Sequence, residues 1–303
     1  MSPPTPPASS TLNIGVLFFD DVQLLDVAPI DLFAMCTKTY LQACDLPAPL
    51  VSRGLDVLNV YFIAQGVPEP PAFSSSSPSP GTSAVPTAPY PAPPATHLLP
   101  TTPGLNLSIA LTHPLSSPLV APGSLDILFV PGPNPKTVPS EAHNAFLRGH
   151  AAAPRTHILV VCTGIFAVGH SGILDGRECT GPRPLVDMKL RGMFPKAKWR
   201  DDRRWVVDRS QKGGVAGKGE EGGKQRGELW STGGISNGMD MVAAYLKEKM
   251  SGELAELVCT FAEVEDRGQV YGQGKAMMGA GFGWLVLRSL WARLWGRESL
   301  KRA

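Results

Sequence analysis

The sequence predicts an α/β domain in which a mostly parallel sheet lies between two layers of helices. Short apolar runs alternate along the chain with longer segments of helical character, which is the order that βαβ units produce. These runs are continuous and end abruptly at turn residues, as strands buried on both faces do. The predicted fold class is therefore a flavodoxin-like three-layer sandwich, interrupted by disordered insertions.

The expected strands are defined by where each apolar run ends. Ile14 to Phe19 stops at two aspartates, and Leu125 to Val130 stops at Pro131-Gly132-Pro133. Such boundaries are typical of strands that lead into sharp turns. Further strands are predicted over residues 57–64, 105–111 and 157–161, with a hairpin formed by 205–208 and 229–232.

The expected helices begin at residues that favour a first helical turn. Pro29 and Pro139 fall near the start of two of them, where a missing N–H is tolerated. Ser236 or Asn237 can cap another. The predicted helices cover residues 27–41, 139–152, 238–249 and 253–264, and one more runs from Gly164 towards a stop at 172–176.

The composition divides the chain into one domain with appendages. A Pro/Ser/Thr-rich leader, residues 1–11, precedes the domain at 12–272, and a tail follows at 273–303. Two insertions, 67–103 and 211–227, interrupt the domain. The first holds 12 prolines and 6 serines in 37 residues and the second is rich in glycine, so both are expected to be disordered.

Charge and cysteine content exclude several classes of function. The formal net charge is +2, from 28 Lys and Arg against 26 Asp and Glu, which gives no electrostatic footprint for nucleic acid. Five cysteines are scattered without a CxxC pair, and no Cys/His metal spacing occurs. We therefore expect a cytoplasmic protein with reduced thiols, no metal and no cofactor. The leader lacks an apolar core, which argues against secretion.

Cys162 lies where a predicted strand meets a predicted helix. At a helix N-terminus the macrodipole and the free N–H groups favour a thiolate, so the pKa of Cys162 is expected below its ordinary value of ~8.5. The Thr163 amide would then face a developing oxyanion. The alternative is that Cys162 is a small apolar residue that completes a buried strand.

Five ordered segments carry a resemblance to the ThiJ/PfpI superfamily, also called the DJ-1 superfamily. The branch that they most resemble is that of the isocyanide hydratases and their fungal relatives. The segments are VLFFDDVQLLDV (16–27), FVPGP (129–133), VVCTGIFA (160–167), GILDG (172–176) and STGGISNGMD (231–240).

The resemblance implies a catalytic cysteine at Cys162 and an acidic partner at Asp26 that moves protons. It implies oxyanion or substrate contacts at Thr163, Gly132 and Gly164. It also implies a cofactor-independent homodimer that acts on a small molecule. Without the resemblance, a helix N-cap is an equal alternative for Asp26.

Two departures from the superfamily pattern narrow the chemistry. Pro133 stands where many relatives have glycine, and proline cannot donate a hydrogen bond. No histidine follows His170, so the Cys-His triad of amidotransferases and related peptidases cannot form. Arg183 could offer a charged donor to substrate, with a plain surface arginine as the alternative.

The tail is basic and rich in tryptophan. Trp284, Leu287 and Trp291 recur at helical spacing, and residues 288–302 hold five basic residues and one acid. Such a helix either docks on its own domain or a dimer partner, or lies on a membrane surface.

Three functions remain open from sequence. The first is a hydratase or hydrolase in which Cys162 attacks an electrophilic carbon, as an isocyanide hydratase would. The second is a glyoxalase or deglycase that acts on reactive aldehydes. The third is a non-catalytic module that senses redox state through Cys162 or binds partners through the insertions.

Overall fold

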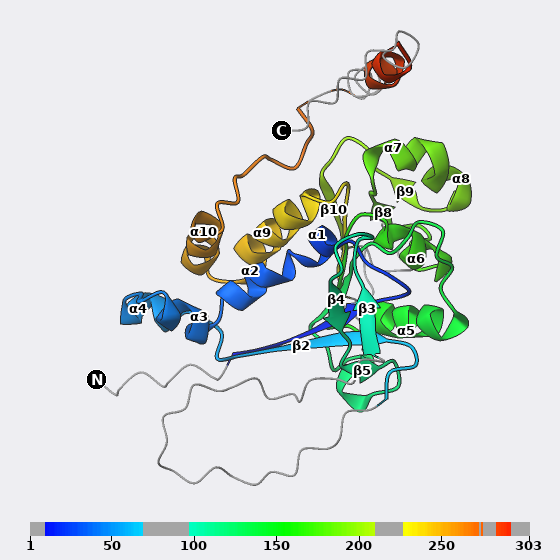
Figure 1. Ribbon diagram of the computed structural model, residues 1–303. Helices are drawn as coiled ribbons and strands as arrows, with labels where there is room; N and C mark the ends of the chain where they lie inside the picture. The colour runs from blue at the N-terminus through cyan, green and yellow to red at the C-terminus, as the bar shows by residue number, and fades with distance from the viewer. Residues whose placement is uncertain (1–9, 69–96, 210–226, 273, 275–282, 292–303) are drawn as a thin grey trace, which may run out of the picture.

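The computed structural model describes residues 10–68, 97–209, 227–272, 274 and 283–291. Its main feature is a seven-stranded sheet with the order β10-β11-β7-β6-β1-β2-β5 (Figure 1). All neighbouring strands are parallel except β10 and β11, which form the predicted hairpin. The strands are β1 (Thr11–Leu17), β2 (Val57–Ala64), β5 (His113–Pro114), β6 (Ile127–Val130), β7 (His157–Val160), β10 (Trp205–Asp208) and β11 (Leu229–Thr232).

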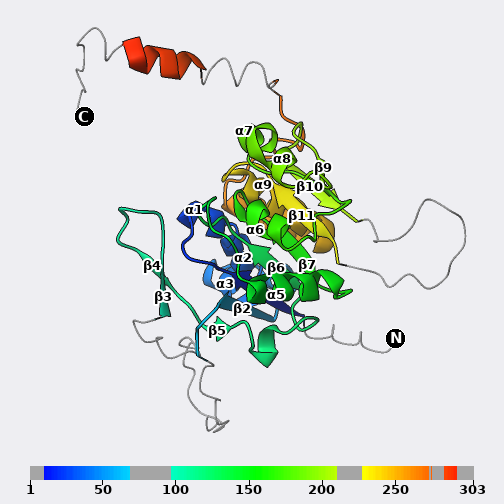
Figure 2. The ribbon, with the colours of Figure 1, turned by 90° about the vertical axis from the view of Figure 1, so that its right-hand side faces the viewer.

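Helices cover both faces of the sheet, as Figures 1 and 2 show. One layer contains α1 (Leu24–Val27), α2 (Ile30–Met35), α9 (Asn237–Lys249) and α10 (Gly252–Phe261). The opposite layer contains α5 (Glu141–Ala152) and α6 (Gly164–His170). The predicted three-layer α/β sandwich is confirmed.

The two faces of each central strand feed two separate hydrophobic cores. In β6, Ile127 and Phe129 belong to the core beneath α2 and α9, whereas Leu128 and Val130 belong to the core beneath α5 and α6. Alternate side chains of a strand point to opposite faces, so a strand covered on both faces must be apolar throughout. This requirement explains the continuous apolar runs of the sequence.

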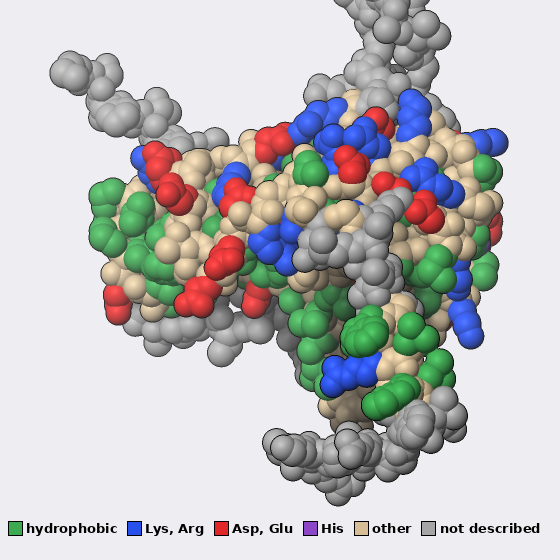
Figure 3. All heavy atoms as spheres, turned by 90° about the horizontal axis from the view of Figure 1, so that it is seen from above, with side chains coloured by type: hydrophobic (Ala, Val, Ile, Leu, Met, Phe, Trp, Pro, Cys, Tyr) green, Lys and Arg blue, Asp and Glu red, His purple; other side chains and the backbone are tan. Residues whose placement is uncertain are grey.

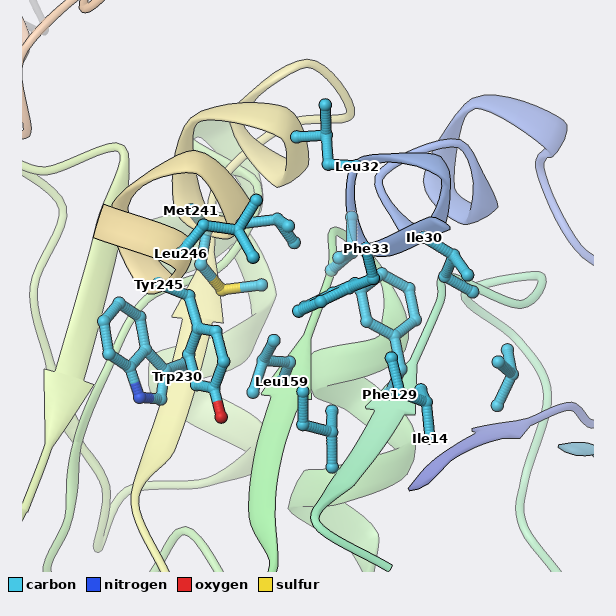
Figure 4. Close-up of a cluster of buried hydrophobic side chains, with 14 of the residues drawn as sticks. Ile14, Ile30, Leu32, Phe33, Phe129, Leu159, Trp230, Met241, Tyr245 and Leu246 are labelled. Atoms are coloured by element: carbon cyan, nitrogen blue, oxygen red, sulfur yellow. The ribbon is translucent and has the colours of Figure 1, made fainter. Parts of the chain in front are cut away.

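Aromatic side chains fasten α9 to the sheet. Trp230 on β11 and Tyr245 on α9 meet edge to face with ring centroids 5.2 Å apart, and Phe33 on α2 contacts Tyr245 at 5.9 Å. Figure 4 shows these rings lying between the helices and the strands that carry Phe129 and Leu159. The packing fixes the position of the α9 N-terminus beside the end of β11.

The prediction of one continuous helix over residues 27–41 is wrong. The chain forms α1, α2 and α3 (Lys38–Ala43) in succession. Pro29 occupies the N-cap position of α2, and Thr37 is extended and accepts a hydrogen bond from the Tyr40 amide as the N-cap of α3. Proline and a capping threonine each begin a helix, so the segment divides at both.

The first insertion is shorter than predicted. β3 (Leu98–Pro100) pairs antiparallel with β4 (Ser108–Ala110), although residues up to 103 were expected to be disordered. Leu99 is buried in the core beneath α2, and the Pro100 carbonyl accepts a hydrogen bond from the Val22 amide. The remainder of this insertion, 69–96, and the second insertion up to 226 lie outside the described residues.

Two further differences concern segment ends. β1 begins at Thr11, within the predicted leader. Of the expected strand over 105–111, only Ser108–Ala110 forms a strand, β4, and β5 follows beyond its end. The smaller elements are α4 (Ala48–Val51), η2 (Pro118–Val120), β8 (Glu178–Cys179), α7 (Arg183–Leu185), η3 (Val186–Leu190), α8 (Arg191–Met193) and β9 (Lys198–Trp199).

A helix over residues 283–291 stands apart from the domain in Figures 1 and 2. Its apolar side chains are exposed, including Trp284 at 66 % and Trp291 at 61 %. The rest of the tail from 292 onwards lies outside the described residues. Within the described part of the chain, no helix combines the length and hydrophobicity needed to cross a bilayer.

Candidate active site

Three adjacent parallel strands place the predicted site residues at one edge of the sheet. β6 pairs with β1 on one side and with β7 on the other. Asp26 lies in the segment after β1, Gly132 in the segment after β6, and Cys162 in the segment after β7. Because the carboxyl ends of parallel strands meet at one edge, residues far apart in sequence come together there.

Cys162 has a left-handed backbone conformation, with φ of 53°. It follows β7 by two residues and precedes α6, so it is part of a turn and does not complete the strand. Left-handed geometry costs a residue with a Cβ roughly 1–2 kcal/mol. Three other described residues that are not glycine share it, and all three are exposed, whereas Cys162 is buried. Strained, buried positions on strand-to-helix turns are typical of nucleophiles.

Asp26 is fully buried beneath this turn. It lies inside α1, and Gln23 occupies the N-cap position, so the capping alternative for Asp26 is wrong. The Gly132 amide donates a hydrogen bond to Asp26 Oδ2 over 3.2 Å. Oδ1 has no conventional hydrogen-bond partner among the described residues, although the Cys162 thiol interacts with the carboxyl group closely enough to affect its pKa.

Gly132 is at a position where only glycine fits. A Cβ there would collide with Asp26 Oδ2 and with Thr163 Oγ1. The amide of Gly132 was expected to serve as a second oxyanion donor, but in the structure it is directed at the Asp26 carboxyl group. Gly132 thus holds the acid in place beside the cysteine.

Thr163 joins the loop after β6 to the cysteine turn. Its hydroxyl donates to the Pro133 carbonyl over 2.7 Å. Pro133 lacks an N–H, yet its carbonyl contributes to the site as an acceptor. The next residue, Gly164, packs against the same loop, since a Cβ there would lie 2.5 Å from the Val130 carbonyl oxygen and 3.0 Å from that of Pro131.

Burial dominates the protonation of the pair. It raises the pKa of Asp26 to about 7, against the hydrogen bonds from Gly132 and Cys162. Burial also raises the pKa of Cys162 to about 12, and the negative charge of Asp26 adds to that effect. The Thr163 amide and hydroxyl act in the opposite direction. The expected fall in the pKa of Cys162 is therefore wrong, because burial and a neighbouring carboxylate outweigh the N-terminus of a seven-residue helix.

The first proton that the pair loses comes from Asp26, because its pKa is about 7 and that of Cys162 is about 12. The remaining proton then lies on the thiol, and its transfer to the carboxyl group leaves the net charge unchanged. The arrangement with a neutral Asp26 leaves a thiolate at Cys162. A buried pair can thus supply a nucleophile without an exposed thiolate at rest.

Arg183 does not join this cluster in its described contacts. Its Nε donates to the Asp201 carbonyl, and its guanidinium stacks over the Tyr271 ring at 4.4 Å. His170 is exposed at the far end of α6 and packs edge-on against Phe194.

Thr232 is a site residue that sequence reasoning missed. Its hydroxyl oxygen accepts a long hydrogen bond of 3.5 Å from the Cys162 amide. It ends β11, which is the neighbour of β7. Its position at the end of an adjacent parallel strand was the available signal.

No family model matches the chain, and no curated protein matches it. Several solved structures match the chain in fold. An AraC family transcriptional regulator from Pseudomonas putida superposes with a TM-score of 0.53 at 13% identity, over 83% of this chain and 99% of that one. DJ-1beta from Drosophila melanogaster gives 0.51 at 10% identity, over 84% and 99%. A ThiJ/PfpI family protein from Pseudomonas syringae gives 0.51 at 14% identity, over 94% and 90%.

Proposed function

We propose that this chain, which has the fold of the DJ-1 and ThiJ/PfpI proteins, is an enzyme of that superfamily with Cys162 as its nucleophile. The observation that supports this most is the left-handed backbone at the buried Cys162. Such strain persists only where surrounding contacts impose it. At this position it presents the sulfur to Asp26 and to the Thr163 amide.

The reaction that fits this pair is the hydration of an isocyanide. The Cys162 thiolate attacks the terminal isocyanide carbon, and the Asp26 carboxyl group delivers a proton to that carbon, which gives a thioimidate. Water then adds to the same carbon, and Asp26 takes one proton from the water and passes it to the imidate nitrogen. The carbon–sulfur bond breaks as the hydroxyl proton passes to the sulfur, and an N-substituted formamide and the free thiol are released.

Each role follows from a contact described above. Asp26 can exchange a proton near neutral pH because burial raises its pKa to about 7. The Thr163 amide stabilises negative charge on the sulfur. An active site in which one group gives and takes back a proton works best when its pKa lies near the working pH.

Two other functions use the same residues differently. A reactive aldehyde could be attacked by the same pair, as in a glyoxalase or deglycase. A non-catalytic module is favoured by the Gly132 amide, because its hydrogen bond to Asp26 withdraws one donor from an oxyanion hole.

The test is turnover of an alkyl isocyanide and of methylglyoxal by the wild type, Cys162→Ala and Asp26→Asn. Cys179→Ala is the matched control, since Cys179 is also buried and its thiol pKa is likewise raised to about 12 by burial. We expect isocyanide turnover that Cys162→Ala abolishes and Cys179→Ala preserves. Turnover of methylglyoxal alone would support the aldehyde reaction. No turnover of either by a folded wild type would support the module.

A further inference from the structure

A cavity lies beside the end of β11. It has a volume of about 500 Å³, and its lining includes Arg183, Arg204, Arg267, Tyr271, Asn237 and Ser236. They come from the start of α7, the segment before β10, the N-terminus of α9 and the segment after α10. Figure 3, which views the end of the molecule that carries α7, shows Lys and Arg side chains on this face with Asp and Glu side chains among them.

The charge of the lining is one-sided. Three arginines line the cavity, and no aspartate or glutamate is among its described lining residues. The guanidinium carbons of Arg183 and Arg204 lie 4.4 and 5.1 Å from the centroid of the same Tyr271 ring. Two like charges against one ring repel each other, and an anion in the cavity would relieve that repulsion.

The acidic residue Asp240 pairs with arginines that line the cavity. Asp240 accepts hydrogen bonds from Arg267 Nε at 3.1 Å and Nη2 at 2.5 Å. Its side chain is almost fully buried, and Arg204 Nε lies 3.9 Å away. The Asp240 carboxylate thus contacts Arg204 and Arg267 without being one of the described lining residues.

The remaining polar groups are also fixed. Arg204 Nη1 donates to the carbonyls of Arg267, Gly268 and Val270 at 2.9, 3.0 and 2.9 Å. The Tyr271 hydroxyl accepts from Asn237 Nδ2 at 2.8 Å. Such preorganisation lowers the entropic cost of binding a ligand.

The lining of the cavity includes a residue close in sequence to a contact of the cysteine turn. Thr232 accepts a hydrogen bond from the Cys162 amide, and Gly234, two positions further on, lines the cavity. Two residues span at most about 7 Å. The cavity lining and the cysteine turn are therefore neighbours.

We propose that this cavity binds an oxyanion group, a carboxylate or a phosphate. Resting on the function proposed above, the inference is also that this group belongs to the molecule whose electrophilic carbon Cys162 attacks. Guanidinium groups match both oxyanions through paired hydrogen bonds. The substrate class is then a small anionic electrophile.

Binding is tested by calorimetric titration of the full chain with inorganic phosphate and with succinate. Arg183→Gln is the variant, because Arg204 and Arg267 also hold the fold together, and Arg183→Lys tests whether charge alone suffices. Arg200→Ala is the control, since Arg200 pairs with Asp202 and Glu178 and is not a lining residue. We expect binding of at least one probe that Arg183→Gln weakens by about tenfold and Arg200→Ala leaves unchanged. Binding of neither probe would overturn the inference. Equal weakening of binding by Arg183→Gln and Arg200→Ala would overturn it as well.

The link to Cys162 is tested with isocyanoacetate and its methyl ester, which share one reacting carbon and differ in charge. Hydration of isocyanoacetate consumes one water and gives N-formylglycine. We expect kcat/KM to favour the acid over the ester by about tenfold in the wild type. Arg183→Gln should remove that preference by raising KM for the acid alone.

The experiments distinguish failure of the anion site from failure of the proposed function. Arg183-dependent binding of phosphate or succinate without turnover of either isocyanide would keep the anion site and contradict the proposed function. Cys162-dependent turnover with no preference for the acid would keep the function and overturn the anionic substrate.

Discussion

The Gly132 amide donates a hydrogen bond of 3.2 Å to Asp26 Oδ2 across 106 positions of sequence. This contact joins the loop after β6 to the helix after β1, and it holds the acid beneath Cys162. The site geometry therefore depends on the absence of a side chain at Gly132. A substitution that adds a side chain there tests it.

Gly132→Ala should lower stability and abolish activity together. The added Cβ collides with the Asp26 carboxyl group and the Thr163 hydroxyl, and overpacking of this kind costs about 1–3 kcal/mol. Chemical denaturation and turnover measure the two effects. Gly192→Ala is the control, because no atom lies within 4 Å of a Cβ at Gly192. Equal behaviour of the two variants would contradict the site geometry.

Asp26→Asn should change how stability depends on pH. The pKa of Asp26 is raised from 3.8 to about 7 by burial, so between these values the folded state binds more protons than the unfolded state. The free energy of unfolding then falls as pH rises through that window, by at most about 4 kcal/mol from this group.

Asn cannot ionise, so the variant should gain stability relative to the wild type between pH 4 and pH 8. Urea denaturation of both proteins across this range measures the difference, and subtraction removes groups common to both. Parallel curves would show that Asp26 does not titrate in that window.

Thr163→Val should loosen the cysteine turn. It removes the hydrogen bond from Oγ1 to the Pro133 carbonyl, at a cost of about 1 kcal/mol, and leaves that carbonyl unpaired. We expect reduced turnover as well, because the turn positions the Thr163 amide. Thr260→Val removes a similar bond to the Glu256 carbonyl on the exposed face of α10. If Thr260→Val reduced turnover equally, the loss would not report on the site.

The helix at 283–291 should carry the chain to anionic lipid. Its apolar side chains are uncovered, with Trp284 and Trp291 more than half exposed, and the sequence that follows is basic. Basic helices with tryptophan bind anionic interfaces. Co-sedimentation with phosphatidylserine vesicles, but not with phosphatidylcholine vesicles, should depend on Trp284 and Trp291. A tail-dependent dimer without vesicle binding would favour docking on a second copy instead.

Much of the architecture could be predicted because burial leaves a direct mark on sequence. β2 begins and ends where its apolar run does, and the β10–β11 hairpin has the predicted strands despite the insertion between them. The divided helix before residue 43 was missed because Pro29 is compatible with the first turn of one long helix as well as with the start of a second. Thr37 acts as a cap through an extended backbone, which the sequence pattern does not show.

The candidate site was predictable in position and less so in electrostatics. Cys162, Asp26 and Gly132 follow neighbouring parallel strands, so their meeting was expected. The pKa of Cys162 depends on how deeply the thiol is buried and on the charge of Asp26. Neither quantity can be read from a strand-to-helix pattern, which is why the predicted direction was wrong.

The proposed chemistry depends most on the electrostatic coupling of Cys162 and Asp26. The direct measurement is the rate of iodoacetamide alkylation at Cys162, followed by mass spectrometry from pH 5 to pH 10, in the wild type and in Asp26→Asn. We predict that alkylation of the wild type keeps rising up to pH 10, because burial and the Asp26 carboxylate raise the pKa of Cys162 to about 12. Asp26→Asn removes the carboxylate, so Cys162 should be alkylated faster in the variant than in the wild type between pH 8 and pH 10. A single inflection at an ordinary thiol pKa in both proteins would contradict the coupling of the two groups.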